Sequence, residues 1–557
     1  MRSRGDRVVV AVAAIVAVGV LVRIAGLGGR PFHWDEARVG YWSLRAAESG
    51  TFSYRPVAGG PLVEHLSRWA IVVAGASDAL VRLPVALLSG LLPAVALCFR
   101  GRLRDDETVA LAIGLGFSPL LVYYGRFLRG DVLAAGAALA VVGLGIRWID
   151  GDDARFLYAA AGVAAVAVAS SGFAVATAVL LLVAGLLVVD HPRVAGEGER
   201  VPGAVAGGAA WIAARATPIA RSGFVFVGAW GVLFAPRGYG ALADPIGFLT
   251  ATYRDPVIAF LAVRVAGREG TELLPFLTDA AGTLAATSLP VFGIALVGFL
   301  ADRYRALPAV ETDRPVVALT AFWAGLGLVG YPVVAETLAP WTLVHAVVPM
   351  CVPAAVGLAA TYRYGRRALD REDAARVATA VLVLAAVAGG VGVAAIDGVY
   401  GPSDPGNEFA SVGQPASDLE PFVAAFDAAI ESGDDRVVYV GERFAVDDEA
   451  TFDAPPIPTA ADRAAFGERL PLTWYVSRTD ARVKSVTSPD GLGAVARTET
   501  AEGGATDAEA PPDDAPAVLI VDPTHEAAVS ERFPGHEAET VELALWNREA
   551  VVFVDTG

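Results

Sequence analysis

Apolar runs about as long as a bilayer is thick recur through the first 400 residues and constrain the fold more than any other feature. A helix needs roughly 20 apolar residues to cross the hydrocarbon core and satisfies its own backbone hydrogen bonds there, so each run predicts a transmembrane helix. A mean hydropathy of +0.52 agrees with this interpretation. We expect a multi-span α-helical membrane protein with eleven spans, at 8–27, 80–98, 107–122, 131–149, 156–170, 172–189, 222–235, 281–300, 315–334, 342–360 and 376–396.

The arginines of the short connections predict the orientation of these spans. Cytoplasmic loops carry an excess of basic residues, and with eleven spans the arginine clusters all fall on one side, at 2–7, 100–104, 303–305 and 363–367. We expect this side to be cytoplasmic, with the N-terminus inside and the C-terminus outside. Arg23 and the lack of an A-x-A site favour an uncleaved anchor over a signal peptide for the first run. Three connections are then exterior: 28–79, 125–131 and 236–282.

From Pro402 the sequence alternates between helix-like and strand-like segments, which predicts a separate soluble domain. The segment DLEPFVAAFDAAIESG is helix-like, whereas RVVYVG, LTWYVSR, AVLIVD and EAVVFVD are strand-like. This alternation is typical of a small α/β domain, which we expect at 402–557, after a membrane domain at 1–400. The acidic, Gly- and Pro-rich stretch 499–516 is predicted to be a flexible insertion.

Charge is divided unevenly between these two parts. Residues 401–557 carry 31 acidic and 10 basic side chains, a net charge of −21, so the remainder carries +4 of the total of −17. This balance argues against nucleic acid as a partner, because phosphates require clustered cations. Lys484 is the only lysine, and an acidic, lysine-poor surface favours a haloarchaeal source at high salt. Cys98 and Cys351 lie in separate apolar runs, so no disulfide framework is expected.

The first exterior connection contains adjacent carboxylates in the stretch GGRPFHWDEARVG, which begins at Gly28. Asp35 and Glu36 are candidate catalytic groups, because neighbouring carboxylates point apart and can serve different partners. One can contact an acceptor nucleophile or a metal, while the other holds the loop. The alternative is an exposed helix N-terminus, where the helix dipole favours acidic side chains.

The second exterior connection reads YYGRFLRGD and holds two arginines near a carboxylate. Arg126 and Arg129 are spaced i, i+3, so both guanidinium groups can project from one helix face. Such a pair suits a phosphate or pyrophosphate, which arginine binds bidentately, with Asp131 beside it. The alternative is that these arginines reach toward lipid head groups, although the charge rule leaves this side of the membrane poor in arginine.

Three histidines and a glutamate complete the candidate residues on the exterior side. His33, His65 and His345 are candidate metal ligands beside Asp35, and a divalent metal ion held by Asp35 and His65 is the cofactor that these residues would accept. The alternative for each histidine is a hydrogen-bonded packing role. Glu336 and His345 lie near the outer end of a span, in YPVVAETLAPWTLVHAVVPM, where ionisable groups are costly unless they are used.

The order of these motifs resembles that of the C-type-fold membrane glycosyltransferases. The sequence is most similar to the archaeal flippase-activity-associated family of N-glycosylation pathways, which is itself similar to protein O-mannosyltransferases and the lipid A aminoarabinose transferase. The resemblance rests on DE after the first span, R-x-x-R-x-D before the fourth, E-x-x-x-P-W-x-x-x-H near the tenth and a soluble-domain signature around LPLTWYVSR. Over residues 1–400 it implies the C-type glycosyltransferase fold and a polyprenyl-phosphate sugar donor.

The resemblance also implies roles for the candidate residues. Asp35 matches the catalytic carboxylate of the first exterior loop, and Glu36 is its neighbour. Arg126 and Arg129 match positions that face the donor phosphate, with Asp131 as their orienting carboxylate. The matches that it leaves without a fixed role are Glu336 and His345.

Two functions therefore remain open. The first is a membrane glycosyltransferase that moves a sugar from a polyprenyl-phosphate donor to an acceptor at the exterior face, in N-glycosylation or cell-surface glycan assembly. The alternative is a non-catalytic partner of a lipid-linked sugar flippase. A transporter should carry ionisable residues in mid-span or paired broken helices, and their scarcity favours the enzyme. The expected partners are a polyprenyl-phosphate-linked sugar, the lipid bilayer and a flippase or glycosylation-pathway protein.

Overall fold

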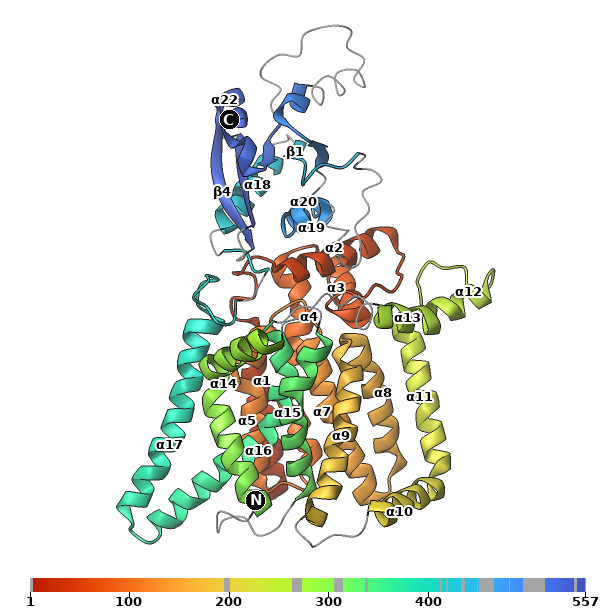
Figure 1. Cartoon of the computed structure of the whole chain (residues 1–557), viewed down its shortest axis with the longest axis vertical. Coiled ribbons are helices and arrows are strands. Elements are labelled where there is room, and N and C mark those ends of the chain that lie inside the picture. The colour runs from red at the N-terminus through yellow and green to blue at the C-terminus, as the bar shows by residue number, and fades with distance from the viewer. Residues whose placement is uncertain are drawn as a thin grey trace.

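The computed structural model describes residues 4–194, 201–262, 273–304, 314–335, 339–410, 413–416, 419–431, 436–447, 449, 465–479, 481–493, 516–544 and 548–555. Three layers follow one another along the long axis of the molecule (Figure 1). A helical bundle forms one end, a layer of shorter helices covers its top, and a domain with a β-sheet stands above that layer. The chain begins at the foot of the bundle and ends in the sheet domain.

The bundle contains the predicted membrane spans. Each of the eleven apolar runs falls on helix. Within the described ranges, seven helical segments are long and apolar enough to cross a membrane, and two apolar helices are shorter. The chain is thus a multi-pass membrane protein, as predicted. The bundle elements are α1 (Arg4–Ile24), α4 (Asp78–Gly90), η1 (Leu92–Phe99), α5 (Asp105–Phe117), α6 (Pro119–Tyr124), α7 (Asp131–Gly151), α8 (Ala154–Ser170), α9 (Phe173–Val194), α10 (Val201–Ala214), α11 (Ala216–Phe234), α14 (Leu273–Tyr304), α15 (Pro315–Val334), α16 (Trp341–Leu369), α17 (Ala374–Val393) and η4 (Ala394–Val399).

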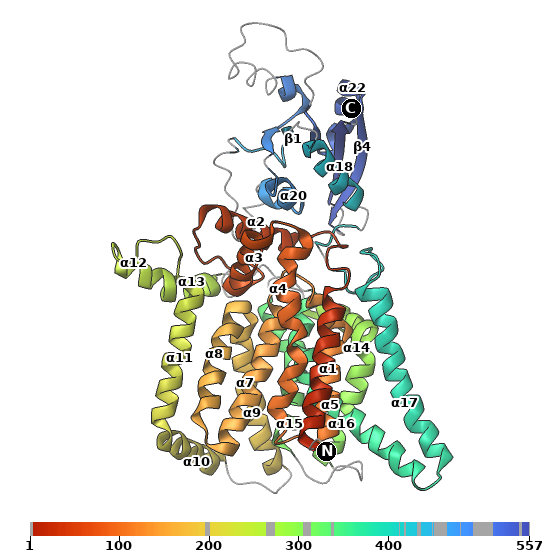
Figure 2. The same cartoon turned by 180° about the vertical axis from the view of Figure 1, so that it is seen from behind.

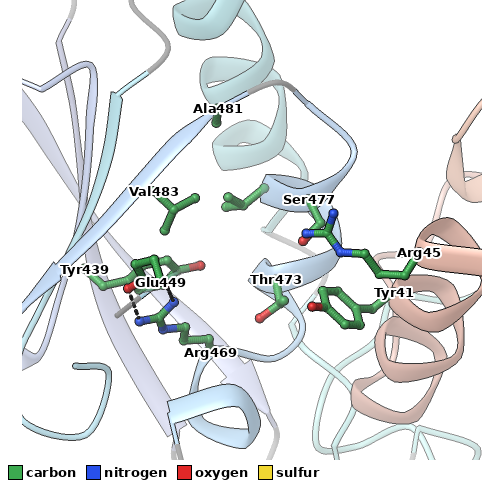
Figure 3. A pocket seen from close by; sticks show the side chains of 10 residues that line it. Tyr41, Arg45, Tyr439, Glu449, Arg469, Thr473, Ser477, Ala481 and Val483 are labelled. Atoms are coloured by element: carbon green, nitrogen blue, oxygen red, sulfur yellow. Dashed lines mark hydrogen bonds and ion pairs between the residues drawn. The ribbon is translucent and has the colours of Figure 1, made fainter. Parts of the chain in front are cut away.

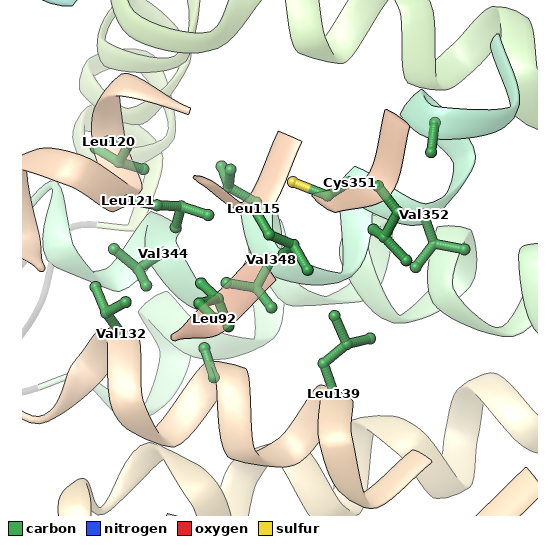
Figure 4. Packing of buried hydrophobic residues seen from close by; sticks show 14 of the residues in the cluster. Leu92, Leu115, Leu120, Leu121, Val132, Leu139, Val344, Val348, Cys351 and Val352 are labelled. Atoms are coloured by element: carbon green, nitrogen blue, oxygen red, sulfur yellow. The ribbon is translucent and has the colours of Figure 1, made fainter. Parts of the chain in front are cut away.

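Close packing of aliphatic side chains and glycines holds the bundle together. Leu92, Val132 and Val348 belong to one large buried cluster, which Figure 4 shows from close by. Where α14 crosses α16, a Cβ atom on Gly298 would lie 1.9 Å from the Pro353 carbonyl oxygen. Only glycine permits this approach, as expected for membrane helices that associate by van der Waals contact. Cys351 lies in the same cluster, and both it and Cys98 are free thiols, as predicted.

The layer above the bundle is built mainly from α2 (Trp34–Ser49) and α3 (Gly60–Ala74). A capping box starts α2, because His33 Nδ1 accepts a hydrogen bond from Asp35 N at 3.0 Å and the Glu36 carboxylate accepts one from His33 N at 3.0 Å. Gly50 ends the helix with φ of +70°. The two predicted catalytic carboxylates therefore lie in a first helical turn. Beside the bundle lie α12 (Pro245–Leu249), η2 (Thr250–Arg254) and α13 (Asp255–Leu261).

The C-terminal domain is built around a five-stranded mixed sheet in the order β2-β1-β3-β5-β4. The central strand β3 pairs in parallel with β1 and in antiparallel with β5. The predicted helix at α18 and the predicted strands at β1, β3 and β5 are confirmed. The domain elements are α18 (Leu419–Glu431), β1 (Arg436–Val440), α19 (Ala465–Arg469), α20 (Leu472–Ser477), β2 (Arg482–Val486), η6 (Pro489–Gly491), β3 (Val518–Val521), η7 (Pro523–His525), α22 (Glu526–Arg532), β4 (His536–Ala544) and β5 (Arg548–Asp555).

The sequence prediction was wrong at one segment of this domain and missed two others. LTWYVSR was predicted to be a strand, but it forms the helix α20, because it docks on the layer below and packing outweighs its β propensity. The strands β2 and β4 were missed, since both are polar edge strands of the sheet. The predicted insertion at 499–516 lies outside the described residues, except for its last position.

Aromatic side chains of α20 attach the domain to the layer beneath it. Trp474 Nε1 and the Tyr475 hydroxyl donate to the two carboxylate oxygens of Asp78, at 2.8 and 3.0 Å. Trp474 also stacks on Phe32, with ring centroids 4.9 Å apart, and a Cβ on Gly40 would lie 2.8 Å from Trp474. Seen from either side, α20 stands directly above α2 (Figures 1 and 2). The segment before α2 is therefore covered by the domain.

Candidate functional site

Asp35 is a partly accessible carboxylate in the first turn of α2. Its side chain is 16% exposed and forms ion pairs with Arg129 and, at 3.3 Å, with Arg38. Burial alone would raise the pKa of Asp35, but the charges of Arg129 and Arg38 outweigh that effect and hold the pKa below its usual value. Asp35 is therefore ionised at neutral pH and can accept hydrogen bonds from a bound molecule.

Arg129 connects Asp35 to a second carboxylate. Its Nε donates to Asp131 Oδ2 at 2.9 Å, while another nitrogen of the same guanidinium contacts Asp35. The guanidinium also lies over the ring of Trp341, 3.9 Å from the centroid. A planar fork between two carboxylates is fixed in orientation, so a phosphate group that reached Arg129 would compete with Asp35 for it.

Asp131 begins α7 and is held from the bundle side. Its Oδ1 accepts a hydrogen bond from the Ser171 hydroxyl at 3.0 Å and lies 3.3 Å from His345 Nε2. Both partners are buried, as is Asp131 itself. The structure thus joins the start of α2, the turn before α7 and the first turns of α16. We call this set the Asp35 network: Arg38, Asp35, Arg129, Asp131, Ser171 and His345.

Glu36 is surrounded by donors on every side. Its carboxylate accepts hydrogen bonds from Arg82 at 2.7 and 2.8 Å, pairs with Arg30 at 2.9 Å, and accepts from the backbone N–H groups of Leu128 and His33. Burial alone would raise the pKa of Glu36, but Arg30 and Arg82 lower it far below its usual range. No lone pair is left for a substrate, so Glu36, which was predicted to be catalytic together with Asp35, holds the loop in this structure; we call it and its donors the Glu36 cluster.

Arg126 lies in a different environment from Arg129. The segment 125–130 is a turn rather than a helix, because α6 ends at Tyr124, so the prediction that the two arginines share a helix face is wrong. Arg126 donates to the carbonyls of Ala25 and Gly26 at 2.8 Å and to that of Val399 at 3.2 Å. These contacts tie α1 to η4, and phosphate binding by Arg126 stays a prediction.

The remaining histidines have packing roles in this structure. His33 is buried, caps α2, and contacts the rings of Phe127 and Trp341. His65 lies 2.9 Å, through Nε2, from the carbonyl oxygen of Leu233, and its ring packs on Phe52. Both rings thus have the hydrogen-bonded packing role that was the alternative to metal binding.

The predicted metal site has no matching group of ligands in the described structure. No group of three or more His, Cys, Asp and Glu side chains within the described ranges is arranged to hold a metal ion. A divalent ion held by Asp35 and His65 therefore stays a prediction. Glu336, the remaining candidate, lies outside the described residues.

Sequence reasoning missed Glu64, which precedes His65 on α3. Its side chain is 1% exposed, and neither carboxylate oxygen has a hydrogen-bond partner among the described residues. The nearest cation is Arg55, at 4.0 Å, which stacks on the ring of Trp42. Burial raises the pKa of Glu64 to about 7 against the opposing charges of Arg55 and Arg68. A buried, unsatisfied carboxylate is a candidate functional group, and its only sequence signal was its place beside His65.

A polar cavity of about 290 Å³ lies between α2 and the C-terminal domain (Figure 3). Tyr41 and Arg45 approach it from α2, two and three turns beyond Asp35, while Arg469 pairs with Glu449 on the opposite wall at 2.8 Å. The buried hydroxyl of Thr473 lies between them without a hydrogen-bond partner in the described chain. This cavity is a polar junction between the layer that carries Asp35 and the domain above it.

The fold of the whole chain is similar to those of solved membrane proteins. ArnT from Cupriavidus metallidurans bound to undecaprenyl phosphate superimposes with a TM-score of 0.56 at 15% identity, over 98% of both chains. The apo state of the same protein gives 0.55 at 16% identity over the same shares. The archaeal oligosaccharyltransferase AglB from Archaeoglobus fulgidus, solved with an inhibitory peptide and a dolichol-phosphate, gives 0.49 at 12% identity, over 95% of this chain and 72% of that one.

At the level of sequence, the match is confined to the C-terminal domain. No curated protein matches the chain. Residues 419–555 match the family model described as the Agl23 flippase-associated protein C-terminal domain, which agrees with the family resemblance and its soluble signature. The C-terminal domain therefore matches the Agl23 flippase-associated family model, and the chain as a whole resembles ArnT in fold.

Proposed function

We propose that this protein is a membrane glycosyltransferase that moves a sugar from a polyprenyl-phosphate donor to an acceptor at the exterior face. The observation that carries the proposal is the Asp35 network, in which a partly exposed carboxylate and a fixed guanidinium meet at the head of the bundle. The fold supports it, because ArnT has this architecture and was solved with undecaprenyl phosphate.

The network supplies the two groups that sugar transfer requires. The acceptor oxygen or amide nitrogen forms a bond to the anomeric carbon, and the bond from that carbon to the polyprenyl phosphate breaks with its electron pair on the phosphate. Arg129 stabilises the leaving phosphate, since a guanidinium binds phosphate oxygens bidentately. Asp35 orients the acceptor hydroxyl or amide and takes its proton.

Donor binding would also strengthen Asp35 as a base. In the structure, Arg129 and Arg38 stabilise the ionised form of Asp35 and lower its pKa. A donor phosphate that replaces Asp35 as a partner of Arg129 weakens the larger of these two interactions, and the pKa of Asp35 then rises toward a value suited to proton transfer. Asp131, held by Ser171 and His345, keeps the guanidinium in place during this exchange.

Replacing Asp35 by Asn tests the enzyme hypothesis. Asn keeps the size of the side chain and caps a helix about as well as Asp, so the protein should fold and retain the donor. Sugar transfer should fall by about two orders of magnitude, the scale of a lost general base. The readout is the composition of exterior glycans in cells, with the protein level checked by immunoblot. Asp244→Asn is the matched control, because that exposed carboxylate contacts only Tyr239 and Gly247 in the described structure.

A non-catalytic partnership with a lipid-linked sugar flippase is the second candidate, favoured by the name of the matched C-terminal family. It requires the phosphate-binding arginine but no base. Normal glycans from a normally abundant Asp35→Asn protein would exclude the transferase and leave this partnership. In a deletion strain, loss of one terminal sugar indicates a transferase, whereas loss of all exterior glycan indicates a role in translocation.

The proposal also requires Asp35 to face the exterior. Ser53 is exposed between α2 and α3, and Gly151 is exposed at the opposite end of α7. Single cysteines at these positions, in a Cys98→Ser and Cys351→Ser background, should react differently with a membrane-impermeant reagent on intact cells. Labelling at position 53 and protection at position 151 are expected, and the reverse pattern would overturn the exterior assignment.

A further inference from the structure

A second charged groove lies at the end of the bundle opposite the C-terminal domain. Figure 1 shows this foot of the bundle as a ribbon. It has a volume of about 660 Å³ and lies between the start of α5 and the last turns of α16. Since α16 carries His345 near its start and Arg363 near its end, the groove is roughly 27 Å along the helix from the Asp35 network. Its lining residues are Arg104, Asp105, Asp106, Tyr362, Arg363, Arg366, Arg367 and Asp370.

A buried ion-pair network fixes the wall of this groove. Glu107, which is fully buried, accepts from Arg314 at 2.5 Å and from Arg363 at 3.1 Å. Arg314 also donates to Asp302 at 2.7 Å, and Arg363 to Asp106 at 2.6 Å. These contacts join α5, α14, α15 and α16, so the wall is rigid. The Nε of Arg363 is buried without a hydrogen-bond partner in the described part of the chain.

Two arginines of the groove are not used in this network. Arg366 and Arg367 are exposed, and neither has an ion-pair partner within the ranges that the structure describes. Arg363, Arg366 and Arg367 follow the spacing i, i+3, i+4, which places their side chains on one face of α16. Three planar guanidinium groups on one face can bind the oxygens of a single phosphate.

The other side chains of the groove restrict the ligand further. Four arginines and three aspartates line it, a formal charge of +1, which a singly charged phosphodiester would balance. Asp105 and Asp370 add carboxylate oxygens that can accept hydrogen bonds from hydroxyl groups of the same ligand. The chemistry is that of a phosphodiester joined to a polyol.

The position of the groove favours a lipid over a soluble phosphate. Tyr362, Tyr364 and Leu369 are exposed around it by 49%, 41% and 62%, as expected at a membrane interface. The adjacent helix α17 exposes Val381 and Leu382 by 60% and 71%, which gives acyl or isoprenoid chains an apolar surface. Basic pockets at the ends of membrane helices are known to hold anionic head groups.

We propose that this groove binds the phosphodiester head group of an anionic lipid whose head group carries hydroxyls, in the leaflet opposite the Asp35 network. The lipid would bridge α5 and α16 at the point where α16 leaves the bundle and turns toward α17. This site is independent of the proposed transferase activity, because it uses no residue of the Asp35 network.

Lipid retention by the purified full-length protein tests the proposal. The protein is exchanged into detergent with phosphatidylglycerol or phosphatidylcholine, and bound lipid is measured by native mass spectrometry together with the thermal unfolding midpoint. We expect selective retention of phosphatidylglycerol and a higher midpoint in its presence. In the double variant Arg366→Gln and Arg367→Gln, affinity should fall about 10- to 100-fold, as for the loss of charge-assisted hydrogen bonds.

A second double variant controls for general loss of positive charge. Arg371→Gln with Arg376→Gln removes the same charge from neighbouring positions that do not line the groove, and phosphatidylglycerol retention should persist. All four side chains are exposed, so both variants should fold, which size-exclusion chromatography checks. Equal losses in the two variants, or equal retention of both lipids, would overturn the site. Displacement of the lipid by millimolar inorganic phosphate would overturn the assignment of a lipid ligand and indicate a site for soluble phosphate.

Discussion

Asp35 and Glu36 are consecutive carboxylates in one helical turn, yet their surroundings are opposite. Glu36 is fully buried and accepts from two arginines and two backbone N–H groups. Asp35 is 16% exposed and has two arginine partners on its flanks. Because every oxygen of Glu36 is already used, it can only hold structure. Asp35 can accept a further hydrogen bond. The number of hydrogen bonds already accepted therefore distinguishes the structural carboxylate from the candidate catalytic one.

The largest expected effect is the loss of stability when Glu36, the structural carboxylate of this pair, is removed. Glu36→Ala leaves Arg30 and Arg82 without their buried carboxylate, which should cost about 3–5 kcal/mol of stability. Glu48→Ala is the control, because its pair with Arg45 is exposed on the same helix and should contribute about 0–1 kcal/mol. Thermal unfolding of the purified proteins in detergent measures both. Equal midpoints for the two variants would remove the distinction between the clusters.

Glu64 extends the comparison to a buried carboxylate with too few donors. Its pKa of about 7 in the folded protein is above the value near 4.3 that a Glu has in an unfolded chain. The folded state therefore binds the extra proton, so the stability that it contributes is fully present below pH 4.3 and is lost as pH rises through 7. Roughly 3–4 kcal/mol should be lost in total.

The variant Glu64→Gln isolates this pH dependence. It should be more stable than the unaltered protein at pH 8 and similar to it at pH 4, since Gln stays neutral at both and the contribution of the Glu64 proton is nearly complete only below pH 4.3. Thermal midpoints at the two pH values give the result. A difference that does not change with pH would show that Glu64 is ionised throughout and has partners that the folded structure supplies.

Arg129→Lys sharpens the comparison on the Asp35 side. Lysine keeps the charge but loses the planar fork, so affinity for a polyprenyl-phosphate sugar should weaken by about 1–3 kcal/mol. The readout is donor binding to the detergent-purified protein. Arg155→Lys is the control, because that arginine is 88% exposed and its one ion-pair partner among the described residues is Asp153. Unchanged affinity at both positions would leave Arg129 with a structural role.

The smallest expected effect concerns the inner end of the Asp35 network. Ser171→Ala removes one of the two contacts of Asp131 Oδ1 and leaves His345 as the other. The loss should be about 1 kcal/mol, the net value of one hydrogen bond. It should appear as a reduced rate of sugar transfer, with donor affinity little changed. Full activity would indicate that His345 alone positions Asp131.

Much of the architecture followed from sequence pattern alone. The helices at the apolar runs and three of the four predicted strands required only local composition, because bilayer thickness and side-chain alternation act over a few residues. The strand predicted at LTWYVSR was wrong because local propensity contains no information about tertiary contacts. Trp474 and Tyr475 are buried against Asp78 and Phe32, which are far away in the sequence.

For the candidate site, the sequence identified several of the residues but not the contacts that they make. The motifs identified Asp35, Arg129, Asp131 and His345 as candidate site residues, and in the structure these four form one connected network. Sequence could not assign Arg126 to carbonyls of α1 and η4, since those partners come from segments that meet only in the folded chain.

By itself, then, the sequence determined a multi-pass bundle, an acidic α/β domain and a DE pair at the start of a helix. Only the tertiary structure decided which carboxylate of that pair is saturated, because Arg82 reaches Glu36 from α4 and Arg129 reaches Asp35 from the turn before α7. It also decided that Glu64 is buried without donors. Ionisation and hydrogen-bond capacity depend on what surrounds a group in space, and adjacent positions in a sequence do not share those surroundings.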